Sequence, residues 1–369
     1  MKVNTISLNS VRLNTIAPNH IGEIRSGGGA SKPSPIPQWI REHVVFYYDV
    51  KKQGATNETL KESAYLQDLS GKGRRMKLNN FLFAEMSGVG GYNDNFSNWR
   101  TDSNNGVVKI ESDSSIVMQS VKIEYRGILY QDSSKNATLK CNITGITEEL
   151  KGKLIFRYTD AEGSKNITLE NGYFEFNSSE YEGLSGWYGF TSKQPIDNCN
   201  ITITQIPEYP GALVTDGVDD YGLVENLSSG VKMLFMTVNP IGNFNSFKNY
   251  YSQMRNAANQ PFCVYSTPAG IAYNYSNPNG ITYIDGVLNE SIGCTKLWGL
   301  KHTITIVNDT VNPTNSGQPA FFSREEWRKG YYSKIAFYNS IAFDSIPTEA
   351  DGFTEQELID YVLTNIIGQ

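Results

Sequence analysis

The chain has 369 residues, of which 19% are charged and 12% aromatic, and its formal net charge is −6. This length exceeds one ordinary domain and is sufficient for two. Its 33 glycines and its aromatic content are typical of strands and turns, not of a helical or disordered chain. Lysine and arginine are scattered without a basic stripe, so we do not expect nucleic acid as a partner.

Residues 1–37 differ from the rest of the chain. Alternating apolar and polar residues in SLNSVRLNTI predict an extended strand, and Gly27-Gly28-Gly29 followed by three prolines predicts a flexible, extended spacer. The segment is either a disordered tail or an arm that adds a strand to another protein's sheet edge. We favour the anchoring arm, because a solvated tail does not need its five regularly placed apolar residues, Ile6, Leu8, Val11, Leu13 and Ile16.

Neither the N-terminus nor the cysteines indicate export. The first twenty residues contain no apolar run typical of a secretion signal, and no run of eighteen apolar residues follows, so we expect no membrane insertion.

Cys141 and Cys199 lie on the apolar phase of alternating segments, which favours core thiols. A bridge between these two is the alternative if their strands are neighbours. Four cysteines are too few for a disulfide scaffold at this length: Cys141, Cys199, Cys263 and Cys294.

From Trp39 onward the residue pattern is typical of a folded globular domain. HVVFYYDV predicts a buried strand, DLSGKG at 68–73 predicts a turn, and residues 76–83 predict a returning strand. A different pattern begins at residue 105. Short segments of alternating apolar and polar residues, separated by turns of Asp, Gly, Ser and Asn, predict a small β-sandwich. Its expected strands are residues 121–126, 137–144, 153–159, 167–170, 173–176 and 199–206.

Beyond residue 208 the pattern is again of strands, and it ends in one helix. Asp216-Gly217 and Asp285-Gly286 stand between apolar runs and predict hairpin turns. In GFTEQELIDYVLTNII, Thr354 and Glu357 have the spacing of a capping box. Core packing, not a partner site, is the favoured role of the helix's apolar stripe, Leu358, Tyr361, Val362 and Ile366. Further strands are expected at residues 231–238, 262–267, 270–275, 281–289, 301–308 and 333–343.

Four motifs follow one another in an order that resembles the laminin-G or concanavalin A-like jelly roll: DLSGKG at 68–73, GALVTDGVDDYG at 211–222, YIDGV at 283–287 and KIAFYNSIAF at 334–343. The resemblance covers residues 38–95 and 208–369. It implies an all-β protein: a concanavalin A-like jelly-roll sandwich with an inserted smaller β-sandwich, an extended N-terminal arm and a C-terminal helix. The expected units are residues 1–37 (arm and Gly/Pro spacer), 38–104 (first part of the jelly roll), 105–207 (inserted sandwich) and 208–369 (second part).

The whole arrangement also resembles virion surface proteins, such as head fibres, of crAss-like phages of gut Bacteroidetes. This resemblance implies a non-enzymatic structural protein, assembled in the host cytoplasm and displayed on the head or its fibres. Residues 1–30 would dock on other virion proteins of the capsid or fibre. A homo-oligomer of such chains would make weak adhesion to host glycans effective through multivalency. The alternatives are a carbohydrate-binding adhesin of tail or cell-surface type and a glycan depolymerase.

No catalytic residue is assigned. Glycosidases need two carboxylates about 5–5.5 Å apart for retention, and no strand presents them on one face. Glu180 and Glu182 come nearest, but Ser and Gly around them favour a loop. The three histidines, His20, His43 and His302, lie in no recognisable nucleophile context. We therefore expect that the protein is not an enzyme.

Two binding functions remain open in the sequence. Asp216, Asp219 and Asp220 offer three oxygen ligands for calcium, the one cofactor considered, but a turn capped by aspartate is favoured. Aromatic rings that stack on sugars, near Asn-rich loops, would suit a glycan site. Core packing explains the same rings, so no glycan-binding residue is assigned among Tyr273, Tyr275, Trp298, Tyr331 and Tyr332.

Overall fold

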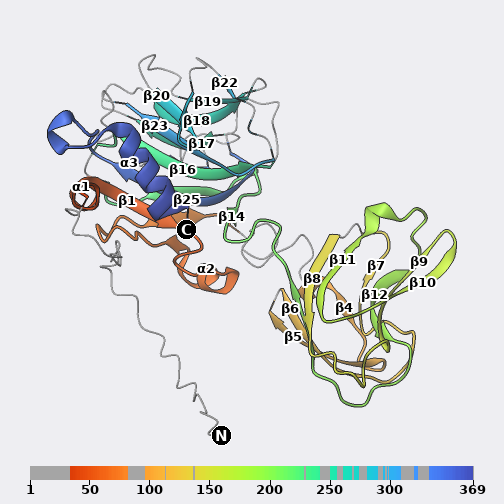
Figure 1. Cartoon of the computed structure of the whole chain (residues 1–369). Helices are drawn as coiled ribbons and strands as arrows, with labels where there is room; N and C mark the ends of the chain where they lie inside the picture. The colour runs from red at the N-terminus through yellow and green to blue at the C-terminus, as the bar shows by residue number, and fades with distance from the viewer. Residues whose placement is uncertain are drawn as a thin grey trace, which may run out of the picture.

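The structure is a computed structural model dominated by strands, and the pairings between its described strands are antiparallel. The all-β prediction is therefore confirmed. Four sheets form two sandwiches, a larger and a smaller one (Figure 1). The structure describes residues 34–81, 96–112, 114–135, 138–227, 230–241, 250–255, 261–267, 270–273, 281–289, 294–295, 297, 299–308, 320–322 and 332–368.

The larger sandwich consists of sheets A and B. Sheet A has seven strands in the order β1-β25-β16-β23-β20-β21, with β14 also pairing β25; they are β1 (Val44–Asp49), β14 (Leu213–Val214), β16 (Met233–Pro240), β20 (Ile281–Ile284), β21 (Val287–Leu288), β23 (His302–Val307) and β25 (Ile335–Phe343). Sheet B has eight strands, in the order β2 (Tyr65–Leu66), β3 (Met76–Asn79), β15 (Tyr221–Val224), β24 (Ala320–Phe321), β17 (Tyr250–Arg255), β18 (Pro261–Thr267), β19 (Gly270–Tyr273) and β22 (Cys294–Thr295).

Strands from distant parts of the chain meet in both of these sheets. β1 pairs with β25 in sheet A, and β3 pairs with β15 in sheet B. The segments before and after the smaller sandwich therefore share one body. The strand connectivity specific to a jelly roll stays a prediction.

The smaller sandwich is built from one contiguous stretch of the chain. Its two five-stranded sheets contain no strand from outside residues 100–205. The order of sheet C is β10 (Gly163–Thr168), β9 (Leu154–Asp160), β12 (Trp187–Ser192), β7 (Leu129–Asp132) and β4 (Arg100–Thr101). The order of sheet D is β11 (Gly172–Asn177), β8 (Thr138–Thr144), β13 (Ile201–Gln205), β6 (Ser115–Val121) and β5 (Gly106–Ser112).

The start of the smaller sandwich precedes the boundary expected at residue 105. β4 pairs with β7 in sheet C. The 3-10 helix η1 (Phe96–Asn98) comes just before it. Phe96 and Trp99 are buried in the core of this sandwich. Their aromatic rings, not the Gly/Asn-rich composition around them, decide which body this stretch joins.

The described residues form three large hydrophobic cores and a small cluster around Ala212, Val214 and Ala336. The first fills the space between sheets A and B, with Phe46 from β1 and Phe321 from β24 in ring contact at 6.0 Å. The second lies inside the smaller sandwich, around Phe156 and Phe190, whose ring centroids are 5.1 Å apart. The third covers the other face of sheet A. No described residue belongs to both the second core and either of the others.

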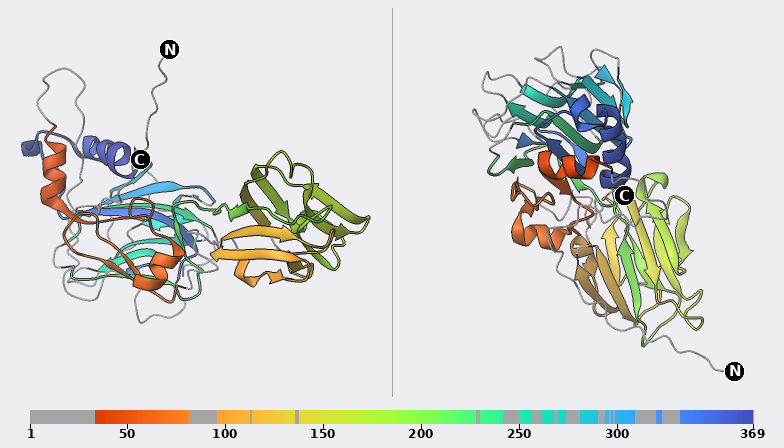
Figure 2. Two further views of the ribbon diagram at one scale, coloured as in Figure 1. Left: turned by 90° about the horizontal axis from the view of Figure 1, so that it is seen from below. Right: turned by 60° about the vertical axis from the view of Figure 1, so that its left-hand side comes forward.

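Short helices cover that outer face of sheet A (Figures 1 and 2). The C-terminal pair, α3 (Glu355–Tyr361) and the π-helix η4 (Val362–Ile367), continue one another. Thr354 and Glu357 form the expected capping box, and Leu358 and Val362 are fully buried, so the core role of the stripe is confirmed. No described helix is long and apolar enough to cross a membrane. The remaining helices are α1 (Ile36–His43), α2 (Asn57–Ser63), η2 (Ser178–Glu180) and η3 (Glu349–Asp351).

Several local predictions are wrong. KPSPIP was expected to be extended, but α1 begins at Ile36, because a proline is tolerated in the first turn of a helix and Trp39 and Ile40 are buried. The strand expected at 121–126 ends at Val121, and Tyr125 adopts φ +54° in the irregular segment that follows. Asp216-Gly217 does not close a hairpin, because β14 pairs in sheet A while β15 pairs in sheet B. The predicted hairpin at Asp285-Gly286 is confirmed between β20 and β21.

Cys141 and Cys199 are free thiols. Cys141 pairs across the sheet with Gln205, not with Cys199. The Cys199 thiol donates instead to the carbonyl oxygen of Met118 at 3.3 Å. Burial raises the pKa of both thiols. The core-thiol interpretation of Cys141 is confirmed, and the alternative bridge is wrong.

Candidate functional site

The three aspartates of DGVDD lie together at the crossing from sheet A to sheet B. One carboxylate oxygen from each of Asp216, Asp219 and Asp220 lies within 4.8 Å of the others. Among the described residues, they form the one group of three or more acidic, histidine or cysteine side chains this close together. The structure therefore brings together the three residues expected from sequence.

Hydrogen bonds within this group form a turn. Asp216 Oδ1 accepts the Val218 N–H at 2.7 Å and the Asp219 N–H at 3.3 Å, and the Asp216 N–H donates to Asp220 Oδ2 at 2.8 Å. Gly217 has φ +77°, and a Cβ there would lie 2.9 Å from the Cβ of Lys334. These contacts support the turn interpretation. The carboxylates of Asp216 and Asp220 accept hydrogen bonds from backbone N–H groups of the segment between β14 and β15.

Burial sets the protonation of Asp220. Its side chain is only 3% exposed, and burial raises its pKa to about 7, with Asp216 and Asp219 adding to the rise while the Asp216 N–H lowers it. A divalent cation would relieve this crowding of carboxylates. The three carboxylates supply part of the six to eight oxygens that calcium takes. The turn stays the favoured role of these aspartates, with calcium binding as the alternative.

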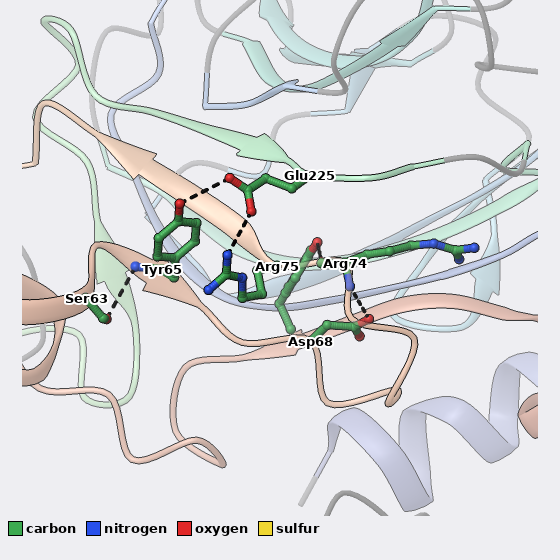
Figure 3. A network of polar contacts seen from close by, with 7 residues as sticks. Ser63, Tyr65, Asp68, Arg74, Arg75 and Glu225 are labelled. Carbon is green, nitrogen blue, oxygen red and sulfur yellow. Dashed lines mark hydrogen bonds and ion pairs between the residues drawn. The ribbon is translucent and has the colours of Figure 1, made fainter.

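A second group of polar contacts lies at one end of sheet B, beside the DLSGKG turn (Figure 3). Glu225 accepts the Tyr65 hydroxyl at 3.1 Å and pairs with the Arg75 guanidinium at 3.2 Å. That guanidinium also lies 4.1 Å from the centroid of the Tyr65 ring. Glu225, directly after β15, is thereby bonded to Tyr65 of β2 at the surface.

Asp68 organises the neighbouring turn. Its Oδ1 accepts the N–H groups of Tyr47 at 3.0 Å and Ser70 at 2.9 Å, and its Oδ2 accepts the Arg74 N–H at 3.0 Å. Arg74 in turn donates from its guanidinium to the Val45 carbonyl at 2.6 Å. The Ser70 hydroxyl also donates to Asp68 Oδ1 at 2.6 Å, and the other partners are backbone groups, so we assign this network to the fold.

The described histidines are also tied to turns. His43 Nδ1 lies 3.0 Å from Asp344 Oδ1, and His302 Nδ1 lies 2.6 Å from Asp285 Oδ2. The other oxygen of Asp285 accepts the Thr303 N–H at 2.8 Å, which fixes the β20–β21 hairpin. No described serine or cysteine side chain is hydrogen-bonded to either ring. His20 lies outside the described residues.

Other residues singled out in the sequence give little further chemistry. Glu180 ends η2 and Glu182 follows it in a turn, so these two carboxylates do not share a strand face. Tyr332 lies with its ring centroid 6.5 Å from that of Tyr221. The five apolar arm residues, and the side chains of Tyr273, Tyr275, Trp298 and Tyr331, lie outside the described part of the chain.

The structure presents one set of side chains that was not anticipated. On the outer face of sheet C, the rings of Tyr130 and Trp187 are 5.7 Å apart. The Arg157 guanidinium lies 5.2 Å from the centroid of the Tyr125 ring. The alternation of apolar and polar residues in KLIFRYT (153–159) indicates this outer face in part, because it places Arg157 on the side of the strand opposite Phe156. The sequence pattern predicts no strand at WYGFTS (187–192) and therefore gives no indication of Trp187.

The fold and these contacts define an all-β protein of two sandwiches whose described polar clusters are built around turns. No protein-family model, no curated protein and no solved structure matches the chain.

Proposed function

We propose that this chain is a non-enzymatic structural protein of a phage virion, displayed on the head or its fibres. Residues 1–30 would anchor it by adding a strand to a sheet of another capsid or fibre protein. The larger sandwich would follow as the base, and the smaller sandwich would be the displayed unit. Several copies on one particle would make individually weak contacts effective.

The observation that carries this proposal is the independence of the smaller sandwich. Both of its sheets and its core come from residues 96–205. It shares no described sheet with the larger sandwich, from which the chain enters it and to which it returns (Figures 1 and 2). A module with its own core on a second sandwich is suited to display. The described aspartates, engaged in a turn, are not suited to cleaving a glycosidic bond.

Removal of residues 2–30 tests the anchoring role. We expect particles assembled with the shortened chain to carry at least ten times less of it than particles with the full chain. Circular dichroism of the purified protein should remain unchanged. Incorporation of the shortened chain at the normal level would contradict the proposal.

A matched pair of full-length variants separates arm chemistry from arm length. In the first, serine replaces the five apolar residues Ile6, Leu8, Val11, Leu13 and Ile16. In the second, serine replaces the polar residues Asn4, Asn9 and Asn14. Only the first variant should be lost from particles, because burial of apolar side chains drives strand addition.

A carbohydrate-binding adhesin is the second candidate. Aromatic rings beside guanidinium groups on the outer face of sheet C favour it. Adhesion and display are compatible, since an adhesive module is useful only where it is exposed.

A further inference from the structure

Five positions form a row across all the strands of sheet C. The register pairs Asn166 with Arg157, Arg157 with Gly189, Gly189 with Tyr130, and Tyr130 with Arg100. The row faces outward, because the residues next to these in the strands belong to the inner core, among them Phe156, Tyr188, Phe190, Leu129 and Trp99. At about 4.8 Å per strand, the row is about 19 Å long.

The centre of the row has no side chain. A Cβ at Gly189 would lie 2.3 Å from the carbonyl oxygen of Leu129 and 2.6 Å from the Cα of Tyr130. Only glycine allows β12 and β7 to approach this closely. The row therefore has side chains on both sides of Gly189, which is itself buried.

Aromatic rings border the row on this face. Trp187 lies two residues before Gly189 in β12 and so points to the same side. Its ring and the Tyr130 ring are inclined at 61° with centroids 5.7 Å apart. Tyr125, 38% exposed, lies against the Arg157 guanidinium. Rings that are partly exposed beside hydrogen-bonding groups offer apolar surface together with polar partners.

The cations of this face differ from others of the same sandwich. Elsewhere Lys109 pairs with Glu111 at 2.8 Å, and Lys140 pairs with Glu175 at 3.4 Å. Among the described residues, no carboxylate lies within 4.0 Å of the charged group of Arg157 or of Arg100. The row thus carries two positive charges and no negative one.

One carboxylate does lie on this face. Asp132 pairs across the sheet with Trp187. Its oxygen accepts the Ser134 N–H at 2.9 Å, and this bond is the main reason that its pKa is lowered, with Arg100 adding a smaller effect. Asp132 is therefore engaged in the turn after β7, and the guanidinium groups remain available to a ligand.

We propose that this face of sheet C binds an oligosaccharide that carries carboxylate groups. The rings would contact the apolar faces of the sugars, and each planar guanidinium would bind a carboxylate through two parallel hydrogen bonds. Arg157 and Arg100 stand three strand spacings apart, about 14 Å, so they reach carboxylates on different sugar units. The inference deepens the proposed display role and rests on it for its biological purpose.

Charge favours this ligand over single-stranded nucleic acid, which also stacks on aromatic rings. Single-stranded nucleic acid carries a charge at every nucleotide and is bound along a continuous positively charged groove, whereas this row has two cations, Arg157 and Arg100. A ligand with isolated carboxylates needs only the two arginines of the row.

The test is an array of acidic and neutral oligosaccharides probed with the purified full chain, followed by calorimetric titration with tetragalacturonate. We expect binding to be confined to carboxylate-bearing glycans and to weaken with added salt. Arg157→Gln with Arg100→Gln should raise the Kd at least tenfold. Trp187→Ala should do the same, with Trp187→Phe in its place if circular dichroism shows that the alanine variant is unfolded.

The matched control is Lys109→Gln with Lys140→Gln, which removes two cations from sheet D and should leave the Kd unchanged. The proposal is overturned if no carboxylate-bearing glycan binds, or if the two arginine substitutions leave binding intact. Tighter binding of a twenty-nucleotide oligo(dT), or self-association through this face in sedimentation, would overturn it in favour of nucleic acid or a second copy. Because the assay uses free protein, its result is independent of incorporation into particles.

Discussion

Single residues in this protein acquire unusual properties where the chain crosses between sheets. Asp220 is the clearest case, because it is almost fully buried beside two other aspartates. Its single described donor is a backbone N–H, from Asp216. A buried carboxylate with so little compensation favours its protonated form.

Asp220→Asn should change how stability depends on pH. The unfolded carboxyl has a pKa near 3.8, and folding raises it to about 7. The stabilising contribution of the bound proton is therefore complete below pH 3.8 and is lost as the pH rises to about 7. Asparagine keeps an oxygen for the Asp216 N–H but carries no charge.

We expect the asparagine variant to exceed the wild type in free energy of unfolding by about 1–4 kcal/mol at pH 8 and to match it near pH 4. Urea unfolding across this range measures the difference. Asp219→Asn, at an exposed position of the same turn, removes only one of the smaller causes of the rise, so its pH profile should lie much closer to the wild type than that of Asp220→Asn. Parallel pH profiles for wild type and Asp220→Asn would refute the expectation.

Among the elements, the C-terminal helix shows how a short segment is held at both ends. Thr354 and Glu357 cap its start. At its end the Ile366 carbonyl accepts the Tyr47 hydroxyl at 3.2 Å and also the Lys52 ammonium. A cation and a hydroxyl at a helix C-terminus satisfy carbonyls that have no partner within the helix. Burial of the apolar stripe on sheet A supplies the rest of the attachment.

Tyr47→Phe should loosen this attachment. The Tyr47 hydroxyl also lies 3.0 Å from Asp49 Oδ2, and Asp49 is 4% exposed. Removing the hydroxyl takes away the one proton that the buried Asp49 carboxylate and the Ile366 carbonyl share, which costs about 1–3 kcal/mol. Chemical denaturation would measure the loss.

Tyr173→Phe is the matched control. The Tyr173 hydroxyl also donates to a carboxylate, Glu175, at 2.6 Å, but the residue is 62% exposed. Water replaces the lost partner there, so we expect a change within about 0.5 kcal/mol. Equal losses in the two variants would mean that burial does not decide the effect.

At the scale of the whole molecule, the two sandwiches have separate cores. The core of the smaller one contains described residues between Phe96 and Ile203 only. It is closed by two five-stranded sheets. A body of this size with its own core is expected to fold as a unit.

Residues 96–207 expressed alone should therefore fold and unfold cooperatively. In the full chain, Phe156→Ala should lower the unfolding midpoint of this sandwich, at a cost of about 3–5 kcal/mol, without moving that of the larger one. Calorimetry of the full chain and of the isolated fragment would show it. A fragment without a cooperative transition would mean that the smaller sandwich depends on its neighbour.

The sequence by itself determined the local features of this protein. Alternation identified most of the strands, Asp285-Gly286 marked a hairpin, and the capping box at Thr354 located the terminal helix. These features depend on contacts between residues close in sequence, which a pattern of residue types records directly.

Only the tertiary structure decided which strands meet. Asp216-Gly217 has the same local chemistry as Asp285-Gly286, yet its flanking strands go to different sheets. Arg157, Gly189 and Tyr130 form one row although up to 59 residues separate them in the chain. Such neighbours are selected by long-range packing of whole sheets, and no local spacing encodes that choice.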